Sequence, residues 1–142
     1  MPLVDLNVEK LELFSAAWAA QAELALQNSL GYQKAAVTWE GTMVFTLSSP
    51  NLEPRSVFFD LWHGECRLAK VAEQADLENA QYIIAANSAT WQEVLGGKLE
   101  PIAALLRGKL KLSKGNIAVL VRHVPAAKEL VLCASSVPTL FL

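Results

Sequence analysis

Three neighbouring segments of this chain alternate apolar and polar side chains with the two-residue period of a β-strand. They cover residues 42–48, 56–63 and about 66–72, and they are rich in the aromatic and β-branched residues that strands favour. The breaks between them are short and have the composition of turns: residues 49–54 contain two prolines, and residues 63–65 contain a glycine. Strands joined by short turns pair antiparallel. The pattern therefore predicts an antiparallel meander.

A helix-favouring stretch precedes the meander. Residues 7–30 contain no glycine or proline and are rich in Ala, Leu, Glu and Gln, so they predict one long helix that Gly31 ends. The apolar face of this helix is expected to cover a core. The residues of that face are Leu11, Leu13, Phe14, Ala17, Trp18, Leu24 and Ala25. Residues 32–39 fit either a short helix or a strand.

Short strands and helices follow the meander. Residues 82–86 predict a fourth strand and residues 109–113 a fifth, half-buried one. Four helices are expected: from Ser88 or Thr90 to Gly96, over 102–107 after Pro101, over 117–124, and from Pro125 to about 135. The apolar residues 137–142 are expected to form an extended tail, because Pro138 disfavours helical geometry in the residue before it.

The composition is more apolar than folding alone requires. Hydrophobic residues make up 53% of the chain and charged residues 18%, against about 25% charged residues in a typical domain. A length of 142 residues suits one domain, expected over residues 1–142, with enough core to fold without disulfides or metals. The apolar surplus excludes disorder and indicates an apolar cavity, a large subunit interface or a membrane-facing patch.

Charge and metal-binding residue types exclude several partners. The formal net charge is −2, and lysines and arginines are interpreted as scattered rather than clustered, so we expect no nucleic-acid partner. Cys66 and Cys133 lie far apart without CxxC spacing, and His63 and His123 alone cannot supply a usual zinc site. We therefore expect no metal, no cofactor and a reducing, cytoplasmic location.

Membrane insertion and export are also not expected. The longest charge-free stretch, residues 79–92, is shorter than a membrane span and contains several polar residues. Asp5 and Glu9 occupy positions where a signal peptide would carry positive charge and then an apolar run.

The only clustering of catalytic residue types is Asp60, His63, Glu65 and Cys66. His63 could act as a base for Cys66, or the four side chains could bind a metal. Strand alternation opposes this, because it directs Asp60 and His63 to opposite faces. A polar strand end with a structural cysteine is the favoured interpretation. The usual hydrolase, nucleotide-binding and metalloprotease motifs are absent from the sequence, so no catalytic residue is assigned.

One continuous segment carries a family resemblance. Residues 91–116 read WQEVLGGKLEPIAALLRGKLKLSKGN. They resemble the C-terminal half of the sterol carrier protein type-two family, in which a capped helix ends in Gly-Lys and a Pro-started helix ends in Gly-Lys-Leu-Lys. A short strand then leads through Gly-Asn or Gly-Asp into a final helix. The expected order of helices and strands upstream also agrees with the family.

The resemblance implies an α+β fold with a twisted five-stranded, mainly antiparallel sheet, helices on one face, and an apolar tunnel between the two. It implies non-enzymatic binding and transfer of an apolar small molecule such as a fatty acid, acyl-CoA or sterol-like lipid. The residues expected to line the tunnel are Phe45, Phe59, Trp91, Leu95, Ile102, Leu105, Leu106, Leu112, Ile117, Leu120 and Val121.

Other interpretations stay open at this point. The chain could be an accessory subunit of a lipid- or quinone-biosynthesis enzyme, in which case the apolar surplus would cover a protein interface. An enzyme acting through the residue 60–66 group is a third hypothesis. The surface could also make transient contact with a membrane, or it could pair with a second copy of the chain in a homodimer. Leu140, Phe141 and Leu142 are expected either to cover the domain's own apolar surface, to plug the tunnel mouth, or to dock on a second subunit.

Overall fold

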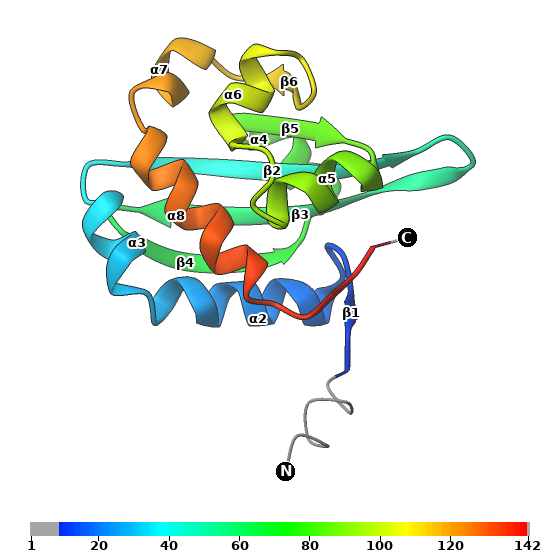
Figure 1. Cartoon of the computed structure of the whole chain (residues 1–142), viewed down its shortest axis with the longest axis horizontal. Coiled ribbons are helices and arrows are strands. Elements are labelled where there is room, and N and C mark those ends of the chain that lie inside the picture. The colour runs from blue at the N-terminus through cyan, green and yellow to red at the C-terminus, as the bar shows by residue number, and fades with distance from the viewer. Residues whose placement is uncertain (1–8, 142) are drawn as a thin grey trace.

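Five strands form one mixed sheet at the centre of the protein. A computed structural model describes residues 9–141, and in it the strands lie in the spatial order β4-β3-β2-β5-β6 (Figure 1). Their bounds are β2 Glu40–Ser49, β3 Leu52–Trp62, β4 Glu65–Val71, β5 Tyr82–Ala86 and β6 Lys111–Lys114. β2, β3 and β4 pair antiparallel, which confirms the predicted meander. The loop expected at residues 49–54 is instead a hairpin tip, because β3 already begins at Leu52.

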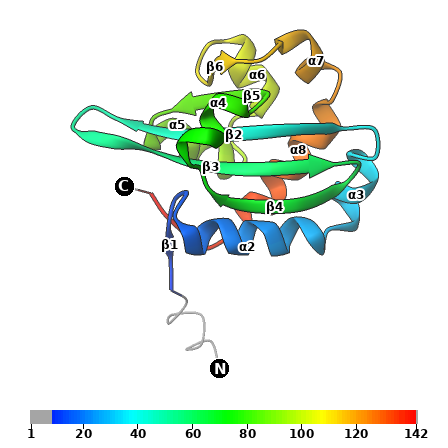
Figure 2. The same cartoon turned by 180° about the vertical axis from the view of Figure 1, so that it is seen from behind.

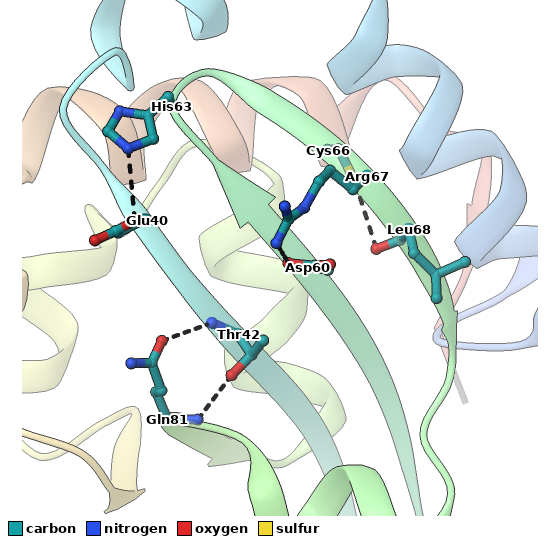
Figure 3. A network of polar contacts seen from close by, with 8 residues as sticks. All are labelled: Glu40, Thr42, Asp60, His63, Cys66, Arg67, Leu68 and Gln81. Carbon is teal, nitrogen blue, oxygen red and sulfur yellow. Dashed lines mark hydrogen bonds and ion pairs between the residues drawn. The ribbon is translucent and has the colours of Figure 1, made fainter.

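The two central strands β2 and β5 are parallel. Phe45 of β2 lies opposite Ile84 of β5. The chain reaches this position by crossing over the sheet through α4 (Gln74–Asn79), where only a connection was expected. Thr42 and Gln81 fasten the start of β5, since the backbone N–H of each donates to the side-chain oxygen of the other at 3.1 and 3.0 Å (Figure 3). β6 joins β5 antiparallel, so the sheet is mainly antiparallel.

The remaining helices cover one face of the sheet and one of its edges. Their bounds are α2 Ala16–Gln27, α3 Leu30–Ala35, α5 Ser88–Leu95, α6 Pro101–Leu106, α7 Ile117–Val121 and α8 Val124–Ser135. α4 is the exception and lies on the opposite face, where it stands in front of the strands in Figure 2. Layers of this kind confirm the α+β class expected from the sequence.

The single helix predicted for residues 7–30 is not what forms. Residues 7 and 8 lie outside the described part of the chain, and Phe14 has a positive φ of 63°, which no helix allows. This turn lets Leu13 and Phe14 both reach the core, where each is fully buried. α2 starts after it, with Ser15 as the cap that accepts from the backbone N–H of Trp18 at 3.2 Å.

A second cap divides the helical stretch again. The hydroxyl of Ser29 accepts from the backbone N–H of Tyr32 at 3.0 Å and starts α3, which resolves the ambiguous residues 32–39 in favour of a short helix followed by a turn. Leu24, expected on the buried face, is 49% exposed, because α2 covers the sheet edge with its other side.

Segments near the two ends of the described chain pair with each other. β1 (Leu11–Glu12) runs parallel to β7 (Thr139–Leu140). The backbone N–H of Leu13 donates to the carbonyl of Leu140 at 3.1 Å, and the indole N–H of Trp18 donates to the hydroxyl of Thr139 at 2.9 Å. The extended geometry predicted after Pro138 is therefore present at Thr139 and Leu140. Leu142 lies outside the described residues.

Candidate functional site

An apolar pocket lies between the helix-covered face of the sheet and the helices α3, α5, α6, α7 and α8. Its wall consists of Tyr32, Trp39, Met43, Phe45, Ile84, Trp91, Val94, Pro101, Ile102, Leu105, Leu110, Leu120, His123, Ala126, Ala127, Leu130 and Val131. These residues come from parts of the chain that are distant in sequence. Only the complete fold therefore forms this wall.

The strands supply the floor of the pocket through their two-residue period. Met43 and Phe45 project to the same face of β2, and the parallel register adds Ile84 from β5 beside Phe45. Phe45 contacts the ring of Trp91 at a centroid distance of 5.2 Å. The indole N–H of Trp91 donates to the main-chain carbonyl of Thr46 at 2.9 Å. The one polar atom of this side chain is thereby satisfied by the sheet, and its apolar ring is left for the wall.

The short helix α6 covers the pocket from above. Glu100 caps it, because its two carboxylate oxygens accept from the backbone N–H groups of residues 102 and 103 at 3.1 and 2.7 Å. Ile102 and Leu105, three residues apart, face the pocket. After the helix, Gly108 adopts a positive φ of 76° and turns the chain so that Leu110 also reaches the wall.

Two side chains bring polar atoms to an otherwise apolar wall. The Tyr32 hydroxyl is buried without a hydrogen-bond partner in the described structure, and burial raises its pKa. His123 packs against Trp39 at a centroid distance of 4.9 Å. No acidic side chain, lysine or arginine lines the pocket within the residues described. The site can therefore hold an apolar molecule but offers no paired groups for acid–base or nucleophilic chemistry.

The pocket is narrow. Its cavity volume is only about 50 Å³. A surface groove shares Val94, Pro101 and Val131 with the pocket and continues it outward between α8 and the turn before α6. An apolar molecule of substantial length would have to displace part of the helical cover to enter.

The structure brings five of the eleven residues selected from the sequence into this wall. These are Phe45, Trp91, Ile102, Leu105 and Leu120. Phe59 lies behind Phe45, at a ring distance of 5.3 Å, and Leu95 lines the neighbouring surface groove. Leu112 and Ile117 pack against the core without reaching the pocket wall. Whether any of the eleven contacts a ligand stays a prediction.

Leu106 and Val121 are placed differently from what the sequence suggested. They are 63% and 42% exposed. In α6 the inward positions are Ile102 and Leu105, so the next residue points away from the wall. The same holds in α7, where Leu120 is inward and Val121 outward. Both residues are corrected here from pocket-lining to surface positions.

Sequence reasoning missed most of the wall. Met43 could have been found, because it shares a strand face with Phe45, and the residues 126, 127, 130 and 131 of α8 follow the helical period. Tyr32, Trp39 and His123 carried no such signal, since they come from turns and short helices that meet only in the tertiary structure. The described tail residues do not line the pocket, so the expected plug at its mouth is not seen.

The group Asp60, His63, Glu65 and Cys66 forms no catalytic arrangement. His63, Glu65 and Cys66 line one surface hollow, but Asp60 is not part of its wall. Figure 3 shows Asp60, His63 and Cys66 each engaged with other residues. Asp60 pairs with Arg67 at 3.0 Å. His63 pairs with Glu40 at 3.5 Å through Nε2 and contacts the carbonyl of residue 37 at 2.8 Å through Nδ1. Cys66 is 2% exposed, and burial raises the pKa of its thiol to about 12. A thiol of this kind is a poor nucleophile at neutral pH.

Neither a metal cluster nor a bilayer-crossing helix is present in the described part of the chain. No group of three or more His, Cys, Asp or Glu side chains in residues 9–141 could hold a metal ion. Over the same residues, no helix has the length and apolar character needed to cross a bilayer.

Comparison with known proteins identifies the family. The sequence model of the SCP-2 sterol transfer family matches residues 19–128. A crystal structure of a sterol carrier protein 2 superimposes with a TM-score of 0.80 at 46% identity, covering 89% of this chain and 99% of that one. A solution structure of a Thermus thermophilus protein, described as possibly a sterol carrier protein, gives 0.81 at 43% identity, covering 93% and 94%. A search of curated proteins found no match.

The fold and pocket thus define a small α+β domain of the lipid-carrier class. The chain belongs to the SCP-2 sterol transfer family. More distant relatives share the fold: a sterol carrier protein 2 from Yarrowia lipolytica, in its apo form, superimposes with a TM-score of 0.50 at 20% identity, covering 84% of this chain and 80% of that one. Family membership supports lipid binding or transfer in general terms.

Proposed function

We propose that this protein binds an elongated apolar small molecule, such as a fatty acyl chain or a sterol-like lipid, in the apolar pocket and carries it without chemical change. The observation that carries the proposal is the wall itself, in which aliphatic and aromatic side chains surround the space and no acidic side chain, lysine or arginine takes part. A carrier needs a surface that replaces the solvent around an apolar molecule, and this wall supplies it.

The energetics of such a wall are sufficient for useful binding. Transfer of a chain of about 14 methylene groups from water is worth on the order of 10 kcal/mol gross, at about 0.8 kcal/mol per group. The cost of association is of the order of 4–15 kcal/mol. Apolar contact alone can therefore give measurable affinity, which is consistent with a pocket that has few polar groups.

The narrow pocket requires the helical cover to move when a ligand enters. α6 and α7 are only six and five residues long, so each is held by few turns of its own. The groove that shares Val94, Pro101 and Val131 with the pocket gives a route outward. We propose entry between α8 and the turn before α6.

Titration with a fluorescent fatty acid tests this function. Ala127 of α8 lines the pocket, so Ala127→Phe should fill it and weaken binding at least tenfold, which is about 1.4 kcal/mol. Ala20→Phe on the exposed side of α2 is the matched control and should bind as the parent does. Equal affinities in all three proteins, or no binding by the parent, would overturn the proposal.

A second candidate is an interaction subunit beside an enzyme. The observation that favours it is the pair Trp62 and Leu68 on β3 and β4, which are 43% and 42% exposed. Arg67 lies over the Trp62 ring at 5.0 Å, and such cation–aromatic surfaces are common at protein interfaces. Trp62→Ser would abolish co-purification of a partner if this candidate were correct, and would leave fatty-acid binding unchanged.

A further inference from the structure

The hydroxyl of Tyr32 is a polar group that the fold buries and leaves without a partner. Tyr32 belongs to the pocket wall and is 0% exposed. Among the residues that the structure describes, this hydroxyl is the one buried side-chain nitrogen or oxygen atom that has no hydrogen-bond partner. Buried polar groups in folded proteins almost always find one, so this exception requires an explanation.

The backbone of α3 holds Tyr32 at a defined place on the wall. Its N–H donates to the hydroxyl of Ser29 at 3.0 Å, and its carbonyl accepts from the N–H of Ala36 at 2.9 Å. Ser29 and Ala36 are the caps at the two ends of α3. The Tyr32 ring is therefore carried by a short helix that is fastened at both ends.

A phenylalanine at this position would fill nearly the same space without an unpaired group. The hydroxyl costs the unliganded protein stability, since folding takes it away from water and returns no hydrogen bond. Burial also raises the pKa of Tyr32, so the group stays a neutral phenol that can donate one hydrogen bond and accept another. Local departures from the most stable arrangement are typical of binding sites. A ligand can supply the partner that the protein does not.

The rest of the wall limits the chemistry of that ligand group. No acidic side chain, lysine or arginine lines the pocket within residues 9–141, and an ionised group is costly to bury without an opposite charge. The indole N–H of Trp91 is already bonded to the carbonyl of Thr46. His123 is only half-buried, so water can reach its ring. The group that fits beside Tyr32 is therefore a neutral oxygen, either a hydroxyl or a carbonyl.

A charged head group has a different place, in the groove that continues the pocket outward. Lys128 lines this groove, and Tyr32 does not. In Figures 1 and 2, α3 lies on one side of α8, and α5, whose end borders the groove, lies on the other. A fatty acid can thus keep its carboxylate near Lys128 with only its tail inside the pocket, whereas a neutral head group can lie against Tyr32.

We infer that the preferred ligand is a neutral long-chain amphiphile that enters with its hydroxyl or carbonyl oxygen leading, and that Tyr32 recognises this oxygen through a hydrogen bond. The inference rests on the proposed function, because it assigns a head group and an orientation to a ligand of the same pocket. The bond gives the Tyr32 hydroxyl the partner that it lacks in the unliganded protein. A molecule without such an oxygen leaves the hydroxyl unpaired, and this difference creates selectivity.

Four molecules of similar chain length test this recognition. Decanol can donate and accept a hydrogen bond, methyl octanoate can only accept one, decane can do neither, and decanoate carries a charge. Intrinsic tryptophan fluorescence gives the binding signal, since Trp39 and Trp91 line the pocket. The quantity to compare is the change in each affinity on Tyr32→Phe, because the transfer of each compound from water is the same for both proteins and cancels.

Tyr32→Phe should weaken the binding of decanol about tenfold, which is about 1.4 kcal/mol. A similar loss for methyl octanoate would show that Tyr32 also recognises a carbonyl, and a loss for decanol alone would restrict the recognised group to a hydroxyl. Decane and decanoate should bind equally to both proteins. Tyr82→Phe is the matched control and should change none of these affinities, because Tyr82, the other tyrosine of the chain, is 8% exposed and lies outside the pocket wall.

Several results would overturn the recognition. Equal weakening of decane and decanol would show that Tyr32→Phe changes the shape of the pocket. An equal loss for decanoate would contradict the restriction to neutral groups. Unchanged affinities for decanol and methyl octanoate would remove the role of Tyr32 but leave the proposed function standing as long as decane or decanoate binds. If the parent binds none of the four molecules, the proposed function fails and the recognition with it.

The stability of the unliganded proteins gives an independent check. Tyr32→Phe should be at least as stable as the parent to urea, because it removes a buried group without a partner. A clear loss of stability would show that the Tyr32 hydroxyl is already bonded before any ligand enters, and this result would also overturn the inference.

Discussion

The indole N–H of Trp91 donates a hydrogen bond of 2.9 Å to the main-chain carbonyl of Thr46, and this bond joins α5 to the strand that forms the pocket floor. Trp91 is 2% exposed, and its ring also contacts Phe14 at 5.2 Å in an edge-to-face arrangement. One side chain thus connects the helical cover, the sheet and the segment before α2.

Replacement of Trp91 by Phe should destabilise the protein by about 1–3 kcal/mol, because it removes the hydrogen bond and leaves space in a buried aromatic cluster. Chemical denaturation measures this change. Trp62→Phe, at a 43% exposed position, is the control and should change stability by less than about 0.5 kcal/mol. Similar losses in the two variants would show that the bond to Thr46 does not matter.

Tyr32→Phe should stabilise the protein without ligand by about 1 kcal/mol. The Tyr32 hydroxyl is fully buried and lacks a hydrogen-bond partner, so folding removes it from water without compensation. Thermal and urea denaturation of the two proteins give the comparison. A loss of stability in the variant would mean that the hydroxyl has a partner, such as a buried water.

Cys66 should make stability fall at alkaline pH. Burial, followed by the nearby Glu23 carboxylate, raises the pKa of its thiol from an ordinary 9.0 to about 12. The folded state therefore holds a proton that the unfolded state releases, so its contribution to stability is complete below pH 9.0 and is lost as the pH rises toward 12.

Urea denaturation between neutral pH and about pH 10 measures this effect, with Cys66→Ala as the comparison. The variant should lose less stability over that range than the parent. At neutral pH the parent thiol should react with a thiol reagent only on unfolding. Rapid reaction of folded Cys66 would contradict both expectations and would revive the hypothesis of a nucleophile in this turn.

Deletion of residues 139–142 should cost stability and leave the rate of fatty-acid binding unchanged. The deletion removes the bond from Trp18 to Thr139 and the pairing of Leu13 with Leu140, while the described tail residues do not line the pocket. Thr139→Val is the milder variant, and it should cost about 1–3 kcal/mol because it leaves the buried indole N–H unpaired. A faster on-rate in the deletion would restore the idea of a plug.

The sequence was informative where local patterns decide structure. Alternation in residues 42–72 predicted the meander, and Pro101 and Gly108 marked the limits of α6. The resemblance of residues 91–116 led to the correct family. These features depend on the periodicity of apolar side chains and on turn-forming residues, and both can be recognised from residues close together in the sequence.

Features that depend on long-range contacts could not be predicted from the sequence, for a physical reason. The left-handed turn at Phe14 is disfavoured for this residue type, and it is compensated only by burial that the finished core provides. The exposure of Leu106 depends on which side of a six-residue helix faces the sheet, which its own sequence does not specify. Tyr32 and His123 meet in the pocket wall only through tertiary packing.

The parallel pairing of β2 with β5 has a consequence for the order of folding. Phe45 and Ile84 are neighbours in the pocket floor but are separated in sequence by β3, β4 and α4. Loop-closure entropy makes such distant contacts slower to form than the local hairpins on either side of β3. The hairpins are therefore expected to assemble first, and the pocket floor should become complete only in a late step. Substitutions at Ile84 should then accelerate unfolding more than they slow folding.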